Sequence, residues 1–251
     1  MIDLHMHLIP DVDDGAESFE ETEKLLLQAI EQGIEAIIAT PHSREAFFKK
    51  SSNTYKQYYL LNNLIESKKL NIKVYLGSEV RCKVSKMDKI LKALKTKELP
   101  SLNNTQYVLV ELCAGQYILP EKDMMKCIDR LREEGWIPVI AHAERYDLPI
   151  KTIKEMKKRG CFIQINMYSI VDDPNEKICN NTEVMLKEKL VDFVGTDAHR
   201  LKRKQSILKT KKPRPVKVEN AVSYLYKNYE KDYVDDILYN NAKKRIIDGT
   251  S

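Results

Sequence analysis

The chain has 251 residues, of which 43% are hydrophobic and 31% are charged, and its formal net charge is +5. This composition allows one α/β barrel or two smaller domains with an ample core, and it excludes a fibrous or low-complexity protein. No apolar run approaches the roughly 20 residues that cross a bilayer, and the first residues do not resemble a signal peptide. Five scattered cysteines without a Cys-x-x-Cys pair indicate reduced thiols, so we expect a cytoplasmic, single-domain protein.

The first fourteen residues contain the first candidate site. Alternate residues of a strand point to the same side, so His5 and His7 present two imidazoles from one face. An acidic cluster follows at Asp11, Asp13 and Asp14. Imidazole and carboxylate are the usual ligands of hydrolytic divalent metals. A single His-x-His pair is nevertheless a weak motif, because surface histidine pairs are common.

Helical segments and short apolar runs alternate along the rest of the chain. Hydrophobic periodicity and capping signals, including a capping box from Ser18 to Glu21, predict helices at about residues 18–33, 55–70, 85–97, 120–134, 149–159 and 182–190, with two more within 218–247. The apolar runs predict strands at the start of the chain and at residues 35–40, 73–78, 107–110, 136–141, 161–165 and 191–195. This alternation is typical of a parallel sheet, either doubly wound or closed into a barrel.

The position of the candidate ligands decides between these two folds. Six of them lie at or just after the C-terminal end of a predicted strand: His5, His42, Glu79, Glu111, His142 and Asp197. In a closed barrel these ends converge on one face, whereas in an open sheet they form a row and mostly miss one another. We therefore predict a barrel with a site at the C-terminal ends of its strands.

All five histidines of the chain take part in this pattern. Each lies at the end of a strand, and four belong to the alternate-residue pairs His5/His7, His142/Glu144 and Asp197/His199. A structural role is the commoner explanation for any single histidine, but it would have to hold five times. With Asp14, Glu79, Glu111 and Asp197 the histidines supply about nine nitrogen and oxygen donors, too many for one ion. We therefore expect two or three Mn, Fe or Zn ions. Such centres catalyse metal-dependent hydrolysis, and a phosphoryl group is one of their substrates.

Several motifs resemble those of the PHP (polymerase and histidinol phosphatase) family: His5-x-His7, Thr40-Pro-His42, Gly77-Ser-Glu79, Glu111, His142-x-Glu144-Arg145-Tyr146 and Thr196-Asp-Ala-His199. Residues 7–16 and the Arg-Tyr pair are similar to bacterial tyrosine-protein phosphatases of capsule and exopolysaccharide gene clusters. The likeness runs from residue 1 to about 200. It implies a distorted (β/α)7 barrel over residues 1–251, with helices of about 218–247 packed on it. It also implies a three-metal site, commonly with manganese, whose ligands are His5, His7, Asp14, His42, Glu79, Glu111, His142, Asp197 and His199.

The resemblance also implies an activity and a partner. A metal-activated water or hydroxide would attack the phosphorus of phosphotyrosine, and the tyrosine oxygen would leave. The expected substrate is the tyrosine-rich tail of a bacterial tyrosine kinase. Arg145 would bind the phosphate, since a guanidinium suits the charge of a phosphoryl group.

The sequence departs from the family pattern in two places. Ala143 replaces the usual proline of a His-Pro-Glu-Arg motif. Arg200 replaces the usual asparagine after Asp-Ala-His, and Lys204 lies where an arginine is expected, with Arg203 one residue before it. We predict Arg203 as the second phosphate contact, with Arg200 and Lys204 as alternatives.

Four alternative functions compete with this one. No cysteine has an arginine six positions later, so a cysteine-dependent phosphatase is excluded. A histidinol-phosphate or other small phosphoester phosphatase remains open, although that branch more often has a histidine in place of the Asp13-Asp14 element. Residues 200–217 hold nine Lys or Arg and no acidic residue, which fits a nuclease, a solvated loop or a basic rim for an acidic phosphopeptide. No aromatic residue interrupts that run, so nucleic acid is not the expected partner. A binding module would have lost ligands, and none is missing.

Overall fold

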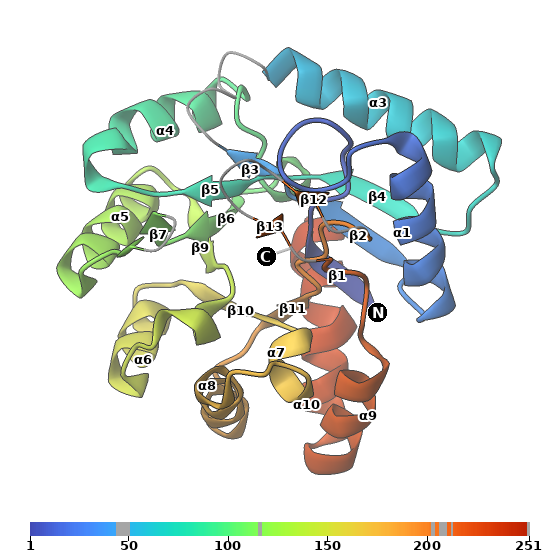
Figure 1. The fold of residues 1–251 in the computed structure, drawn as a ribbon. Coiled ribbons are helices and arrows are strands. Elements are labelled where there is room, and N and C mark those ends of the chain that lie inside the picture. The colour runs from blue at the N-terminus through green and yellow to red at the C-terminus, as the bar shows by residue number, and fades with distance from the viewer. Residues whose placement is uncertain (44–50, 115–116, 202–203, 206–209, 212, 250–251) are drawn as a thin grey trace.

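The computed structural model describes residues 1–43, 51–114, 117–201, 204–205, 210–211 and 213–249. A curled parallel sheet lies at its centre and helices surround it (Figure 1). One part of the sheet has the order β1-β2-β4, formed by Ile2–Met6, Ala36–Ala39 and Lys73–Leu76. The other part has the order β11-β10-β9-β6-β5-β3, formed by Phe193–Gly195, Phe162–Asn166, Ile137–Ile140, Tyr107–Glu111, Glu79–Arg81 and His42–Ser43. The predicted class, an α/β fold with a parallel sheet that curls, is confirmed.

The two parts of the sheet adjoin at both sides. On one side, β3 and β5 follow β2 and β4 after interruptions of two residues, at 40–41 and 77–78. On the other side, the Asp197 N–H donates to the His5 carbonyl at 2.8 Å and the His7 N–H donates to the Ala198 carbonyl at 2.9 Å. The first and last strands therefore lie side by side, and the C-terminal strand ends surround one face.

Helices occur where the sequence predicts them. The longer ones are α1 (Phe19–Glu31), α3 (Ser51–Ser67), α4 (Met87–Lys95), α5 (Glu121–Glu133), α6 (Ile150–Lys158), α8 (Glu176–Lys187) and α9 (Glu219–Asn228). The C-terminal segment continues as α10 (Lys231–Asp235) and two π-helical turns, Asp236–Asn240 and Lys243–Ile247. Among the described residues, no helix is both long and apolar enough to cross a membrane.

Some elements differ from the prediction. Helix α8 begins six residues earlier than expected, because the Asn175 side chain caps it by accepting from the Lys177 N–H. The sequence does not predict the short helix α7 (Tyr168–Val171) or two short antiparallel strand pairs. These pairs are β7 (Cys113–Ala114) with β8 (Tyr117–Ile118), and β12 (Lys204–Gln205) with β13 (Thr210–Lys211).

The predicted capping box of α1 forms only in part. The Ser18 hydroxyl accepts from the Glu21 N–H at 3.3 Å, as expected. The Glu21 carboxylate, however, accepts from the N–H groups of Glu17 and Leu201 at 3.0 and 2.8 Å. Helix α1 is thereby attached to the segment that follows β11.

Apolar side chains from opposite strands fill the interior of the sheet. One buried cluster joins residues of β1, β2, β6, β9 and β11 with the C-terminal π-helical turn, and it includes Ile2, Leu4, Ile38, Leu109, Val139, Phe193 and Ile246. A larger cluster joins the sheet to the surrounding helices. The polar strand ends are thus supported by an apolar core on both faces of the sheet.

Asp3 fixes the first strand to the end of the last. Its Oδ2 accepts from the Thr196 hydroxyl at 2.6 Å, and its Oδ1 accepts from the Thr196 N–H at 2.9 Å. Burial raises the pKa of Asp3 to about 6. These bonds hold together the two strands whose ends carry His5, His7, Asp197 and His199.

Replacing Thr196 tests this attachment. Thr196→Val keeps the shape but leaves a buried carboxylate oxygen without its hydroxyl donor, which should lower the free energy of unfolding by about 1–3 kcal/mol. Denaturant unfolding of the metal-free protein measures the change. Ser67→Ala removes an exposed side-chain hydrogen bond and should change stability by less than about 0.5 kcal/mol. Equal effects of the two substitutions would contradict the role of the attachment.

Candidate metal centre

A buried carboxylate, that of Glu79, lies among four imidazoles. Its Oε2 is 2.6 Å from His42 Nδ1 and 3.5 Å from the Nε2 atoms of both His5 and His7. Its Oε1 is 2.9 Å from His142 Nε2. The His5 and His7 Nε2 atoms lie 3.2 Å apart. The ends of β1 and β9 and the first residues of β3 and β5, which continue β2 and β4, therefore meet around one group of donors.

The remaining predicted ligands adjoin this group. Asp14 Oδ1 lies 3.3 Å from His42 Nε2 and 3.7 Å from His199 Nε2. Asp197 Oδ1 lies 3.5 Å from His7 Nε2 and 3.4 Å from His199 Nδ1. Within the described part of the chain, three sets of donors are close enough to hold an ion: His7/Asp14/His42/His199, His5/His7/Glu79 and His42/Glu79/Glu111. The structure thus brings all nine predicted ligands into one network.

Asp13 orients two of the histidines, and the sequence did not identify it as a site residue. Its Oδ2 lies 2.6 Å from His7 Nδ1 and accepts from the His42 N–H at 2.9 Å. Burial opposes protonation of His7, but the Asp13 carboxylate raises the pKa of that imidazole to about 9. A hydrogen bond from Nδ1 to a carboxylate leaves His7 Nε2 directed at Glu79 and Asp197. This is the arrangement in which outer carboxylates orient metal-binding histidines.

His199 is held as a neutral imidazole. Its Nδ1 lies 2.8 Å from the carbonyl oxygen of Asp197, which can only accept, so Nδ1 carries the proton. Burial and the nearby His7 hold the pKa of His199 well below its usual value. Its Nε2 accepts from Arg214 Nη2 at 2.7 Å. The nitrogen with the free electron pair therefore faces Asp14 and the Arg214 guanidinium.

Two arginines share one oxygen of Asp197. Arg145 Nη1 lies 2.9 Å and Arg214 Nη1 lies 2.6 Å from Asp197 Oδ2. Burial alone would raise the pKa of Asp197, but Arg214 and Arg145 hold it well below its usual range. Both guanidinium side chains remain partly exposed, at 32% and 41%. They form a positive edge at the accessible side of the centre.

The donor set fits divalent transition metals. The Nε2 atoms of His5 and His7 face each other. A proton or a cation must therefore lie between their two electron pairs. Glu79 Oε2 is fully buried and forms no well-aligned hydrogen bond, although His42 Nδ1 lies 2.6 Å away. Buried polar atoms of this kind normally have a partner, and a cation among these nitrogen and oxygen donors would supply it.

The predicted phosphate contacts lie in different parts of the structure. Arg145 lies at the centre, as described above. Arg203 lies outside the described residues. Arg200, one of its alternatives, is buried with its guanidinium 3.8 Å from the Glu17 carboxylate, because it points to the opposite side of the backbone from His199. Arg214 reaches the centre. The sequence indicates Arg214 only as one of the basic residues in the run 200–217.

One predicted alternate-residue pair, His142 with Glu144, does not point to the same side. Residues 143–146 form a 3-10 helix, and His142 has a left-handed backbone (φ 36°, ψ 52°). The Glu144 carboxylate therefore turns away and accepts from the Ser169 hydroxyl at 2.8 Å.

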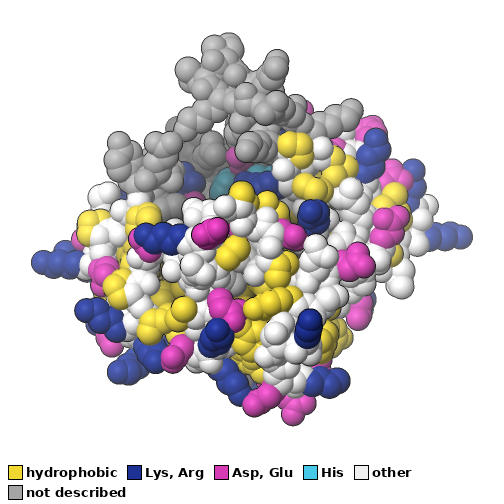
Figure 2. Space-filling view, turned by 60° about the horizontal axis from the view of Figure 1, so that its bottom comes forward, with side chains coloured by type: hydrophobic (Ala, Val, Ile, Leu, Met, Phe, Trp, Pro, Cys, Tyr) yellow, Lys and Arg dark blue, Asp and Glu magenta, His cyan; other side chains and the backbone are white. Residues whose placement is uncertain are grey.

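The centre is mostly buried. The His5, His7, Glu79, Asp197 and His199 side chains are less than 5% exposed, whereas His42 and Asp14 are 14% and 20% exposed. Accordingly, Figure 2 shows a small area of histidine surface beside Lys and Arg side chains. Access is thus from the side of Asp14 and the two arginines.

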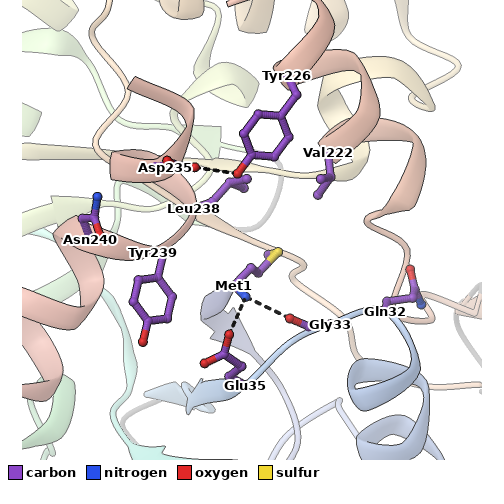
Figure 3. A pocket seen from close by; sticks show the side chains of 10 residues that line it. All are labelled: Met1, Gln32, Gly33, Glu35, Val222, Tyr226, Asp235, Leu238, Tyr239 and Asn240. Carbon is purple, nitrogen blue, oxygen red and sulfur yellow. Dashed lines mark hydrogen bonds and ion pairs between the residues drawn. The ribbon is translucent and has the colours of Figure 1, made fainter. Parts of the chain in front are cut away.

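A separate pocket contains no comparable group of donors. It is lined by residues of the β1 and β2 starts and of the C-terminal helices, and its volume is about 440 Å³ (Figure 3). Its two carboxylates are already paired, Asp235 with Tyr226 and Lys231 and Glu35 with the Met1 amine. Among the described residues, the groups of donors close enough to hold an ion lie at the opposite strand ends.

The fold and the histidine–carboxylate centre define a PHP-type α/β protein. The chain belongs to the family described as capsular polysaccharide synthesis, CpsB/CapC, which matches residues 1–247. It is 27% identical over 252 residues to the tyrosine-protein phosphatase CpsB of Streptococcus agalactiae, covering 97% of both chains. It is 29% identical over 210 residues to the tyrosine-protein phosphatase YwqE of Bacillus subtilis, covering 80% of this chain and 78% of that one.

A solved structure is also similar over the whole chain. It comes from crystal structures of YwqE from Bacillus subtilis and CpsB from Streptococcus pneumoniae, described as unique metal-dependent tyrosine phosphatases. The TM-score is 0.81 at 25% identity, with 100% of this chain and 96% of that chain covered.

The role of Asp13 can be tested against a neighbour in the same loop. Asp13→Asn removes the charge that holds the proton on His7 Nδ1, so Mn²⁺ affinity should fall by about 10–100-fold. Asp11→Asn is the matched control, because Asp11 is exposed and Asn tolerates its positive φ of 58°. Calorimetric titration with Mn²⁺ measures both. Unchanged affinity in Asp13→Asn would show that His7 needs no outer carboxylate.

Proposed function

We propose that this protein is a metal-dependent phosphotyrosine-protein phosphatase. The observation that carries the proposal is the network of nine nitrogen and oxygen donors with Arg145 and Arg214 at its accessible edge. The family and the tyrosine-protein phosphatases among its relatives support tyrosine phosphate as the substrate. The family description supports a role in capsule or exopolysaccharide synthesis. The tyrosine-rich tail of a bacterial tyrosine kinase is the proposed partner.

The nine predicted ligands are proposed to hold two or three divalent ions, with manganese favoured over iron and zinc. The donors supply nitrogen and oxygen but no thiolate, which suits all three metals. Such ions supply a hydroxide nucleophile at neutral pH and neutralise phosphoryl oxygens. His5, His7, Asp14, His42, Glu79, Glu111, His142, Asp197 and His199 would hold them.

Arg145 and Arg214 are proposed to bind the phosphate of the substrate. Each guanidinium now donates to Asp197 Oδ2 and has further N–H groups available at the accessible edge. A guanidinium can donate two parallel hydrogen bonds to phosphate oxygens and stabilises the charge that develops during transfer. Arg214 would have to release His199 Nε2 before that nitrogen could bind an ion. Arg214 is therefore a second proposed phosphate contact beside Arg145, and Arg203, which lies outside the described residues, stays a prediction for this role.

The finer statements about fold and location are also proposals. We take the curled sheet to be the distorted (β/α)7 barrel of a single domain, supported by the hydrogen bonds between the ends of β1 and β11. We place the protein in the cytoplasm, where its thiols would stay reduced. The described cysteines support this, because Cys82, Cys127, Cys161 and Cys179 are all unbridged.

A substrate comparison tests the function. The purified protein should hold at least two transition ions per chain and hydrolyse a phosphotyrosine peptide faster than histidinol phosphate or short single-stranded DNA. A chelator should abolish this activity and Mn²⁺ should restore it, because the nucleophile depends on the ions. Activity of the metal-free protein would exclude the mechanism. Preference for histidinol phosphate or DNA would replace the proposed substrate class.

Substitution of the two arginines tests their role. Arg145→Ala and Arg214→Ala should each lower kcat/KM for a phosphotyrosine peptide by about 10²-fold, the usual effect of losing one donor to a transition-state oxyanion. The content of bound metal should not fall in either variant. Arg159→Ala is the control, because that arginine binds Asp129 and Glu155 on the outer surface. Metal loss in either variant would instead mean that the arginine maintains the centre.

A further inference from the structure

Strand β10 differs from the other strands around the centre, because no His, Asp or Glu lies at its described C-terminal end. It ends in two amides, Gln164 and Asn166, which are alternate residues and are both fully buried. Alternate residues of a strand share one side, and here that side faces the predicted ligands. These amides contact His5, His142 and Asp197.

The orientation of both amides is fixed by groups that have a single hydrogen-bonding role. The Asp197 carboxylate can only accept, so Asn166 directs Nδ2 to its Oδ2 at 3.1 Å. Asn166 Oδ1 therefore accepts from Gln164 Nε2 at 3.0 Å, and Nε2 also donates to the Ile165 carbonyl at 2.7 Å. At the other end, the His142 N–H can only donate, and it donates to Gln164 Oε1 at 2.9 Å.

This orientation determines the protonation of His5. Gln164 Oε1 lies 3.2 Å from His5 Nδ1 and can only accept, so the proton of the neutral ring must be on Nδ1. The electron pair of Nε2 is then free, and Nε2 faces Glu79 and Asp197 at 3.5 and 3.7 Å. Gly195 maintains the approach, since a Cβ there would lie 2.6 Å from His5 Cβ and 3.1 Å from Gln164 Nε2.

The same glutamine supports a strained backbone. His142 adopts a left-handed conformation with φ 36°, which is strained for a residue with a side chain. The bond from its N–H to Gln164 Oε1 fixes this conformation, in which Nε2 reaches Glu79 Oε1 at 2.9 Å. One side-chain oxygen thereby sets the direction of two imidazoles.

Asn166 acts on the carboxylate. Its amide engages Asp197 Oδ2, the oxygen that also binds the two arginines. The other oxygen, Oδ1, remains directed at the imidazoles of His7 and His199 at 3.5 and 3.4 Å. The Asn166 amide thus helps to hold Asp197 Oδ2 toward the arginines and leaves Asp197 Oδ1 for the ions.

We propose that Gln164 and Asn166 are positioning residues of the centre, which prepare His5, His142 and Asp197 for metal binding before any ion arrives. The proposal rests on the metal-binding part of the proposed function. It assigns to β10 a role different from that of its neighbours, which supply ligands. Because the effect is on preorganisation, it should be measurable in the metal-free protein as well as in metal affinity.

The first measurement is Mn²⁺ binding by titration calorimetry. Gln164→Leu and Asn166→Leu should each weaken binding by about 10–100-fold. Gln164→Glu keeps an oxygen acceptor for His5 and His142 but loses the donations to Ile165 and Asn166, so it should recover part of the affinity lost in Gln164→Leu. Gln32→Leu is the matched control, since the Gln32 side chain also bonds to backbone groups, those of Gln28, Val216 and Val218, at the opposite end of the sheet. It should lower thermal stability without changing Mn²⁺ affinity.

The second measurement is the tautomer of His5, followed by nitrogen–proton NMR of the imidazole rings in metal-free protein. The parent protein and Gln164→Glu should have the proton on Nδ1, and Gln164→Leu should lose this preference. If Gln164→Leu does not fold, Gln164→Glu and the parent still decide the question by their tautomer. An Nε2-protonated His5 in the parent protein, or unchanged Mn²⁺ affinity in folded leucine variants, would overturn the proposal. A parent protein that binds no transition metal would overturn the proposed function instead.

Discussion

The Glu79 carboxylate is buried among imidazoles that come from three other strand ends, and this group of charges constrains the rest of the structure. A buried charge is costly unless it is paired, and burial alone would raise the pKa of Glu79. His42 and His5 instead hold that pKa well below its usual range. The pairing requires the strand ends to meet within a few ångströms, which a curled sheet allows and an open sheet does not. Gly77 and Gly195 leave no room for a side chain, because an added Cβ would lie 2.8 Å from Leu102 and 2.6 Å from His5 Cβ.

The sequence predicts the inner part of the centre well, because convergence of parallel strand ends is a property of the sheet rather than of individual loops. His42 and Glu79, for example, are direct neighbours in the register of β3 and β5, and each follows an apolar run. The same logic predicts the α/β class and the order of helices and strands. It fails at Glu144, because alternation of side chains applies only while the chain is extended, and the backbone after His142 turns into a 3-10 helix.

The outer part of the centre depends on tertiary structure that no local pattern encodes. Asp13 and Asp14 are adjacent and chemically identical, and the loop that turns Asp13 inward uses a positive φ at Asp11 and the contact of Gly15 with the His7 carbonyl. Arg214 follows His199 by fifteen residues and returns to it through the backbone pairing of Arg200 with Arg214. Gln164 and Asn166 left a weak signal, since two polar residues at alternate positions end an otherwise apolar strand.

The attachment of Asp3 to Thr196 also has a consequence for synthesis of the protein. The two residues are 193 positions apart, so the first strand must wait until 193 further residues have been synthesised before this contact can form. Contacts of such long range form late, because the loop they close is entropically costly. While the ribosome is still translating, His5 and His7 are therefore present without Asp197 and His199. The growing chain carries an incomplete centre, and the full group of donors arises only after Asp197 and His199 have been added.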